Sequence, residues 1–290
     1  FKIHRSFEPD FGIVRKGLSP GDSDRFVNVW WEIPPKEYGL GHRWAPYANG
    51  GPFSPYYRST KEVVEWRSQG RVIRAYEFAD GRPRYVIRSA DLYGSAGLTF
   101  GKRGELLNVQ ILPAGQVLSN EGYLILPLGT DSNFWGFLAF FNSIIVRYLV
   151  NMVCGLHKEV GAIKVTPIPD QLLFTPIEEL AWNSKRVYEA YREINNEETN
   201  PEFFLMPLNE FSTISEFMDS YSSRVESLRS IISEGEAKIN TKIADGFQIS
   251  EIELQELNKE QKGLMKSFEL NRANETIEEV SLLSWLFGAI

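Results

Sequence analysis

The sequence has few of the residues that form the commonest catalytic and metal-binding sites. Its 290 residues include one cysteine, Cys154, and three histidines, His4, His42 and His157. A single cysteine excludes a disulfide framework and a cysteine-rich metal site, and it is typical of a reducing compartment, so we expect a cytoplasmic location. No two histidines have the spacing of a metal-ligand pair, so we expect no metal site.

Motifs for nucleotide binding and catalysis are also missing. The sequence contains neither a Walker-type loop nor a G-x-G-x-x-G that follows a predicted strand. The Pro-Pro in residues 32–38 lies between Ile and Lys, whereas an amino-methyltransferase needs Asp, Asn or Ser before it and an aromatic residue after it. "GLSPG" (17–21) matches the serine hydrolase pattern, but Pro20 has no N–H to complete an oxyanion hole. We predict no catalytic residue, and a hydrolase with Ser19 as nucleophile is the least favoured alternative.

Only one apolar run, residues 134–154, is long enough to resemble a membrane span. Asn142, Ser143, Arg147 and Asn151 interrupt it. A single arginine in the middle of a membrane helix costs about 2.5–3.5 kcal/mol on insertion scales. We therefore predict one buried helix over residues 134–153 and no membrane partner.

Charge divides the chain into two parts. The net charge is −7, but residues 1–169 hold 20 Lys and Arg against 15 Asp and Glu, which gives +5, while residues 170–290 hold 11 against 23, which gives −12. Within residues 58–103, ten basic residues are interleaved with aromatic residues. Such interleaving is typical of surfaces that contact phosphates and bases. A solvated sheet surface with ordinary ion pairs has the same composition, so composition alone leaves both interpretations open.

The predicted secondary structure changes from strands to helices along the chain. The first 57 residues are rich in Gly, Pro and aromatics and predict loops and short strands. Residues 60–70 predict a short helix or strand. Further strands are predicted at 71–78, 81–88, 96–104, 106–115, 116–129 and 161–169.

Helices are predicted after Leu172. The apolar spacing indicates helices over 177–194 and 212–243, with Ser212 or Thr213 as N-cap of the second, and a third that begins at Ser250. The second helix has a coiled-coil-like apolar seam, which Glu236 interrupts. The fold class we predict is α+β, a mixed α/β domain followed by antiparallel helices.

Several segments, in order along the chain, resemble large adenine-specific DNA methyltransferases. These are the PglX-like enzyme of BREX phage-defence systems, the methylase of class 1 DISARM systems and type IIG/IIL restriction–modification enzymes. "GLSPGDSDRFVNVWWE" resembles their G-x-x-[ST]-G-[DN]-[ND]-x-x-F and W-x-E, and "RWAPYANGGPFSPYY" their W-x-P-Y-x-x-G-G. Further similar segments are "LTFGKRGELLNVQILPAGQVLSNEGYLILP", "FLAFFNSIIVRYLV", "VGAIKVTPIP", "EETNPEFFLMPL", "AKINTKIADGFQISEIEL" and "SLLSWLFGAI". "SPYYRS" departs from the BREX pattern, which favours a DISARM-like or divergent member.

The resemblance implies a division of the chain into three parts. We expect a junction segment at 1–57, a DNA target-recognition domain at 58–170 and a helical spacer at 171–290. The catalytic domain of the family, with its Asn-Pro-Pro-Tyr, does not occur in this sequence, and both ends look like cuts through a longer protein. S-adenosylmethionine would therefore be a cofactor of the parent enzyme, with none bound by this chain.

The partners implied are double-stranded DNA, the catalytic domain of the same polypeptide and other proteins of a defence system. Lys102 and Arg103 lie between two glycines, so their backbone can approach DNA closely. The residues that we predict to contact DNA are Tyr56, Tyr57, Arg58, Arg84, Arg88, Lys102 and Arg103. The alternative is a non-catalytic protein-interaction module that uses its coiled-coil-like helices.

Overall fold

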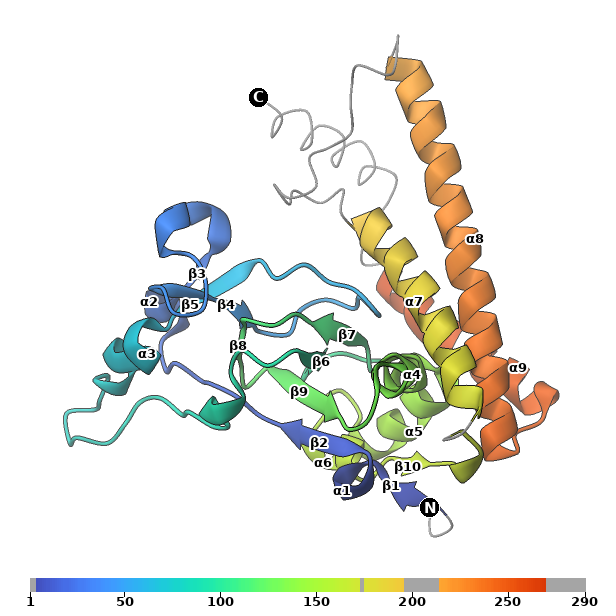
Figure 1. Ribbon diagram of the computed structural model, residues 1–290, viewed down its shortest axis with the longest axis horizontal. Helices are drawn as coiled ribbons and strands as arrows, with labels where there is room; N and C mark the ends of the chain where they lie inside the picture. The colour runs from blue at the N-terminus through green and yellow to red at the C-terminus, as the bar shows by residue number, and fades with distance from the viewer. Residues whose placement is uncertain (1–3, 173–174, 196–213, 270–290) are drawn as a thin grey trace.

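Short strands lie on one side of the molecule and three long helices on the other (Figure 1). The computed structural model describes residues 4–172, 175–195 and 214–269. The fold is α+β, as the sequence predicts. One continuous core cluster joins the sheet to the helices, with members such as Phe100 and Tyr123 from the strands and Val187 and Ile239 from the helices.

The central sheet has four antiparallel strands in the order β2 (Gly12–Arg15), β9 (Gly122–Pro127), β6 (Gly97–Gly101) and β7 (Val109–Leu112). Every residue of β6 is buried, because strands pair on both of its edges and helices cover the sheet. Strand β2, from the first 57 residues, therefore pairs with β9, which follows them. The domain boundary predicted at residue 57 stays a prediction.

A second sheet and a short strand pair complete the β structure. The second sheet has the order β3 (Val27–Val29), β5 (Glu62–Glu65), β4 (Trp44–Ala48) and β8 (Val117–Leu118), and its β4–β8 pair is parallel. Strand β1 (Arg5–Ser6) pairs with β10 (Pro167–Ile168). The short helical elements are α1 (Phe7–Asp10), α2 (Ser23–Phe26), α3 (Arg67–Arg74), α6 (Val160–Lys164) and four 3-10 turns at Trp30–Glu32, Pro35–Glu37, Ala90–Leu92 and Asp170–Leu172.

The single helix predicted over residues 134–153 is wrong. Two helices, α4 (Asp131–Asn142) and α5 (Ile144–Cys154), meet at a bend of 63°. Ser143 breaks the helix because it has extended backbone angles, and its hydroxyl caps α5 by accepting a hydrogen bond from the Val146 N–H. Among the described residues no single helix is long and apolar enough to cross a membrane, although α4 and α5 pass that test as a bent pair.

Three predicted strands are also wrong. Residues 71–74 belong to α3, and 81–88 form only isolated bridges. Residues 161–164 lie in α6, and only Pro167 and Ile168 of the predicted 161–169 strand are extended and paired. In each case β-branched content favoured a strand. Ile73 and Ile163 are instead buried in the core from helices, whereas residues 81–88 are mostly exposed and Pro83 has no N–H to donate to a neighbouring strand.

The long helices agree with the apolar periodicity. They are α7 (Thr175–Asn195), α8 (Ile214–Phe247) and α9 (Glu251–Glu269). The Ser250 cap is confirmed, since the Ser250 N–H donates to Glu253 and the Glu253 N–H donates to the Ser250 hydroxyl. The caps predicted at Ser212 and Thr213 lie outside the described residues. Gly235 permits close packing of α8 on α7, because a Cβ there would lie 2.4 Å from Val187 Cγ2.

Candidate nucleic-acid interface

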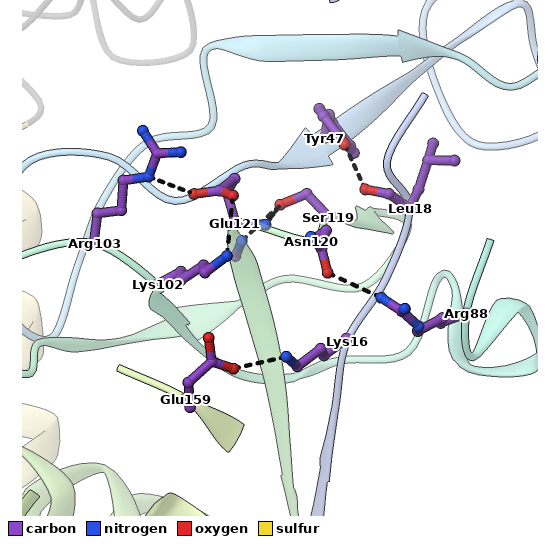
Figure 2. A network of polar contacts seen from close by, with 11 residues as sticks. Lys16, Leu18, Tyr47, Arg88, Lys102, Arg103, Ser119, Asn120, Glu121 and Glu159 are labelled. Atoms are coloured by element: carbon purple, nitrogen blue, oxygen red, sulfur yellow. Dashed lines mark hydrogen bonds and ion pairs between the residues drawn. The ribbon is translucent and has the colours of Figure 1, made fainter. Parts of the chain in front are cut away.

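The turn between β8 and β9 is fixed by hydrogen bonds from several directions (Figure 2). The Ser119 hydroxyl accepts from the N–H groups of Glu121 and Gly122, at 2.9 and 2.6 Å. The Asn120 N–H donates to the Leu18 carbonyl at 2.8 Å, and the Lys102 N–H donates to the Glu121 carbonyl at 2.8 Å. These bonds tie the turn to two neighbouring segments, so its side chains project from a rigid support.

Cationic side chains surround this turn. Arg103 Nε lies 3.2 Å from the Glu121 carboxylate and Lys102 Nζ lies 3.8 Å from it. Arg88 Nη1 donates to Asn120 Oδ1 at 3.3 Å. We call Arg88, Lys102, Arg103, Asn120 and Glu121 the turn cluster. Figure 2 shows all five around the start of β9, where a second ion pair, Lys16 with Glu159 at 2.7 Å, lies beside them.

Arg88 and Arg103 of the turn cluster are exposed, and the Arg103 side chain is 74% accessible. Lys102 is half-buried. The backbone beneath the cluster is closely packed: a Cβ on Gly122 would lie 2.2 Å from the Ala48 carbonyl oxygen. Two exposed guanidinium groups beside a closely packed, hydrogen-bonded turn are suited to binding an anionic surface.

Arg84 belongs to a different set of contacts. Its guanidinium carbon lies 4.4 Å from the Phe78 ring centroid and 5.1 Å from that of Tyr76, and Nη1 donates to the Tyr76 hydroxyl at 3.0 Å. The side chain is nevertheless exposed. Stacking of this kind orients an arginine and leaves its remaining N–H groups available to a ligand.

The structure places two of the other three predicted residues, Tyr56 and Tyr57, against helix α7. Tyr56 is 1% exposed and its ring stacks on Tyr191 of α7, with centroids 5.6 Å apart. Tyr57 packs edge-on against Tyr188, also of α7. We therefore assign Tyr56 to the core, and the DNA contacts predicted for all seven residues stay predictions.

Arg58 is half-buried, and burial lowers the pKa of its guanidinium to about 10. Among the described residues its Nη1 has no hydrogen-bond partner. The nitrogen lies against the backbone of Gly51, where a Cβ would be 2.3 Å from it. Arg58 is thus held beneath the surface, in contrast to Arg103.

A group of polar side chains at the junction between sheet and helices was not predicted as a site. Arg147 is 6% exposed, donates to the Leu107 carbonyl at 3.1 Å and lies over the Phe53 ring at 5.3 Å. The Tyr191 hydroxyl donates to Glu236 at 3.3 Å, and burial raises the pKa of Glu236. Phe53, Tyr191 and Glu236 are among the residues that line a cavity of about 520 Å³. The signal in the sequence was Glu236 itself, which stands where the helical seam should be apolar.

Ser19 is not placed as a nucleophile would be. Its N–H donates to the Val86 carbonyl at 2.7 Å, and its carbonyl accepts from the Val86 N–H at 2.8 Å. The residue thus pairs with an extended segment instead of standing at the apex of a strand-to-helix elbow. No group of three or more His, Cys, Asp or Glu within the described part of the chain could hold a metal ion.

The similarity of this chain to known proteins lies in its structure. No family model matches the sequence, and no curated protein matches it. A solved structure of the type IIL restriction–modification enzyme MmeI, in complex with DNA, aligns with 89% of this chain at 11% identity and a TM-score of 0.47. The chain spans 37% of the length of that enzyme. The DNA in that complex is a ligand of that enzyme.

Proposed function

We propose that this chain is the DNA-recognition part of a restriction–modification or phage-defence methyltransferase that modifies adenine at N6. The observation that carries the proposal is the turn cluster, in which exposed Arg88 and Arg103, from two neighbouring segments, flank a turn held by hydrogen bonds and contact its residues Asn120 and Glu121. The motif resemblance of the sequence supports the same assignment.

The side chains of the turn cluster have the chemistry that base reading requires. Arginine donates two hydrogen bonds to guanine, asparagine pairs with adenine, and glutamate accepts from the cytosine amino group. Arg88, Asn120 and Glu121 supply one of each type within one contact network. Lys102, which is shorter and half-buried, suits a phosphate contact better than a base contact.

Charge distribution would orient the duplex on this chain. The first 169 residues carry a net +5 and the remainder −12. The helical part would repel the phosphate backbone, so DNA would approach the sheet and its turns. We therefore assign no base contact to α7, α8 or α9.

The catalytic step would belong to a domain outside this sequence. In the proposed parent enzyme that domain would bind S-adenosylmethionine, which supplies the methyl group, and would hold the flipped adenine. This chain would position the duplex and read its sequence. It has no glycine-rich loop of the kind that cradles such a cofactor, so we propose no cofactor contact for its residues. Departures from the BREX pattern favour a DISARM-like or divergent system with its own protein partners.

Binding of the full chain to a duplex across a salt series tests the proposal. Each phosphate contact contributes about 0.9 to the slope of log K against log salt, so removing both cations in Lys102→Ala/Arg103→Ala should lower the slope by about 1.8. The matched control, Lys185→Ala/Lys238→Ala, removes two lysines that are each 49% exposed on the helices. The control should bind as the unsubstituted chain does. Absence of salt-dependent binding by the unsubstituted chain would contradict the proposal.

A protein-interaction module is the second candidate, because Trp182 on α7 is 56% exposed. A groove of about 600 Å³ nearby is lined by Trp135, Leu228 and Ile231, among others. This candidate predicts association of the chain with itself that depends on concentration and is lost in Trp182→Ala. Light scattering after size-exclusion chromatography measures it. Such association without duplex binding would favour the second candidate over the first.

A further inference from the structure

Three of the four polar residues that interrupt the apolar α4–α5 run, Asn142, Arg147 and Asn151, bond to one backbone segment. Asn142 accepts from the Val109 N–H at 3.0 Å and donates to the Val109 carbonyl at 2.7 Å. Arg147 Nε donates to the Leu107 carbonyl at 3.1 Å. Asn151 Nδ2 donates to the Glu105 carbonyl at 2.7 Å. Successive polar side chains along α4 and α5 therefore bond to residues 109, 107 and 105, which are alternate residues of the segment in reverse order.

Lys158 extends this series to the basic loop. It is 1% exposed, and its ammonium group donates to the carbonyls of Gly104 at 2.9 Å, Glu105 at 3.1 Å and Gly155. An ammonium has three N–H donors and no acceptor, so three carbonyls satisfy it fully. Burial lowers the pKa of Lys158. A buried cation is costly unless it is fully bonded, so this arrangement requires the loop to keep its shape.

Backbone bonds on both sides of Arg103 complete the attachment. The Lys158 N–H donates to the Lys102 carbonyl at 2.7 Å, and the Gly104 N–H donates to the Leu156 carbonyl at 3.1 Å. Gly104 has φ +148°, a conformation that residues with side chains rarely adopt. The loop that carries Lys102 and Arg103 is thus held to residues 155–158 by backbone hydrogen bonds at Lys102 and Gly104 and by the Lys158 ammonium group.

We propose that Lys158 is a positioning residue for DNA binding, whose buried ammonium holds residues 101–107 in the shape that presents Lys102 and Arg103. Asn151 and Arg147 support the same segment further from the tip. The inference rests on the proposed function. Lys158 itself contacts no DNA, since its side chain has no accessible surface to offer.

Hydrogen exchange tests the mechanical part of the proposal without DNA. Lys158→Met keeps the apolar stem and removes the three donors. The matched control, Lys164→Met, removes one half-exposed lysine from α6, whose ion pair with Glu8 is not part of the loop. Lys158→Met should speed exchange of the Gly104 and Lys158 amides and their neighbours, with the remaining protected amides unchanged, and the control should not. Unchanged exchange in 101–107 would overturn the proposal.

Duplex binding tests the functional part. Lys158→Met should lower the salt slope by up to about 1.8, the value expected for two lost phosphate contacts. In the Lys102→Ala/Arg103→Ala background it should have no further effect, because Lys158 would act only through those two residues. A merely structural role would give the same loss in both backgrounds, and that result would overturn the proposal.

A less disruptive variant keeps the proposal testable if Lys158→Met fails to fold. Asn151→Ala removes one bond to the Glu105 carbonyl, and it should produce the same change in exchange and slope to a smaller extent. If the unsubstituted chain shows no salt-dependent duplex binding, the proposed function fails, and the exchange experiment alone then decides whether Lys158 holds the loop. The two failures are therefore distinguishable.

Discussion

Two regions of this protein combine arginine with polar or aromatic partners, but they differ in exposure. In the turn cluster, Arg88 and Arg103 are exposed to solvent on either side of a hydrogen-bonded turn. At the junction, Arg147 and Tyr56 are buried between the sheet and the helices. The same residue types therefore serve different purposes: the exposed group is suited to binding an anion, whereas the buried group connects two parts of the fold.

The largest difference should appear in stability. Tyr56→Ala removes a core ring that stacks on Tyr191, and we expect the free energy of unfolding to fall by about 3–5 kcal/mol, as for other large aromatic residues in cores. Chemical denaturation measures it. Tyr38→Ala, at a tyrosine that is 43% exposed, is the control and should change stability little. A loss of under about 1 kcal/mol for Tyr56→Ala would place that residue outside the core.

Two arginine substitutions, one at exposed Arg103 and one at half-buried Arg58, should differ in their effect on duplex binding. Arg103→Gln should lower the salt slope by about 0.9 and cost about 1–3 kcal/mol of duplex affinity. Arg58→Gln should leave the slope unchanged, because the Arg58 guanidinium lies beneath Gly51. Fluorescence anisotropy over a salt series measures both. If both variants lowered the slope of log K against log salt equally, Arg58 would contact DNA, and the difference in exposure between the two arginines would not decide which of them binds it.

Glu236 should make the junction sensitive to pH. Burial raises its pKa above 4.5 in the folded state, so the folded chain binds more protons than the unfolded chain between pH 4.5 and the folded pKa. Stability from this group therefore falls as pH rises through that window. Each unit of difference between the folded and unfolded pKa of Glu236 corresponds to about 1.4 kcal/mol in the free energy of unfolding.

Glu236→Gln keeps a partner for the Tyr191 hydroxyl and cannot ionise, so the fall in stability with rising pH should become smaller. Chemical denaturation at several pH values measures it. Glu234→Gln, on the same helix and paired with Lys238, is the control for loss of one carboxylate. An unchanged pH dependence in Glu236→Gln would show that Glu236 is not buried in the folded chain.

The elements that the sequence predicted well are those with strong local signals. Apolar periodicity predicted α8 and α9, and Ser250 as N-cap predicted the start of α9, because both signals depend on residues three or four apart. The break at Ser143 was missed, since apolar residues continue across it and only the packing of α4 and α5 on different surfaces requires a bend. Residues 161–164 were missed for a similar reason, because burial of Ile163 overrode its strand preference.

The candidate site likewise contains residues that local sequence signals predicted and residues that they did not. The glycines around Lys102 and Arg103 predicted an accessible basic loop, and Arg103 is exposed there. Tyr56 was predicted to contact DNA. Its stacking on Tyr191 could not be predicted, because Tyr191 lies on a helix far along the chain and no local pattern indicates that contact. Asn120 and Glu121 were not predicted at all, although a polar turn between two apolar strands was visible in "VLSNEGYLIL".

The smallest effect concerns Glu121 on a duplex that lacks its proposed base partner, since its carboxylate lies 3.2 Å from Arg103 and 3.8 Å from Lys102, the two cations proposed to contact phosphate. Glu121→Gln removes the competing charge, and the turn should persist because Ser119 and backbone groups hold it. Exposed ion pairs are worth about 0.2–1 kcal/mol, so duplex binding should tighten by a few-fold at most.

Anisotropy titration with a duplex of random sequence measures the Glu121 effect, with Glu234→Gln on α8 as the control for loss of one negative charge. Weaker binding of Glu121→Gln would contradict a role as internal competitor. If the weakening were confined to duplexes with a cytosine at one position, the carboxylate would instead accept a hydrogen bond from that base. The turn cluster would then gain its specificity from an acidic residue, and its cations would supply affinity alone.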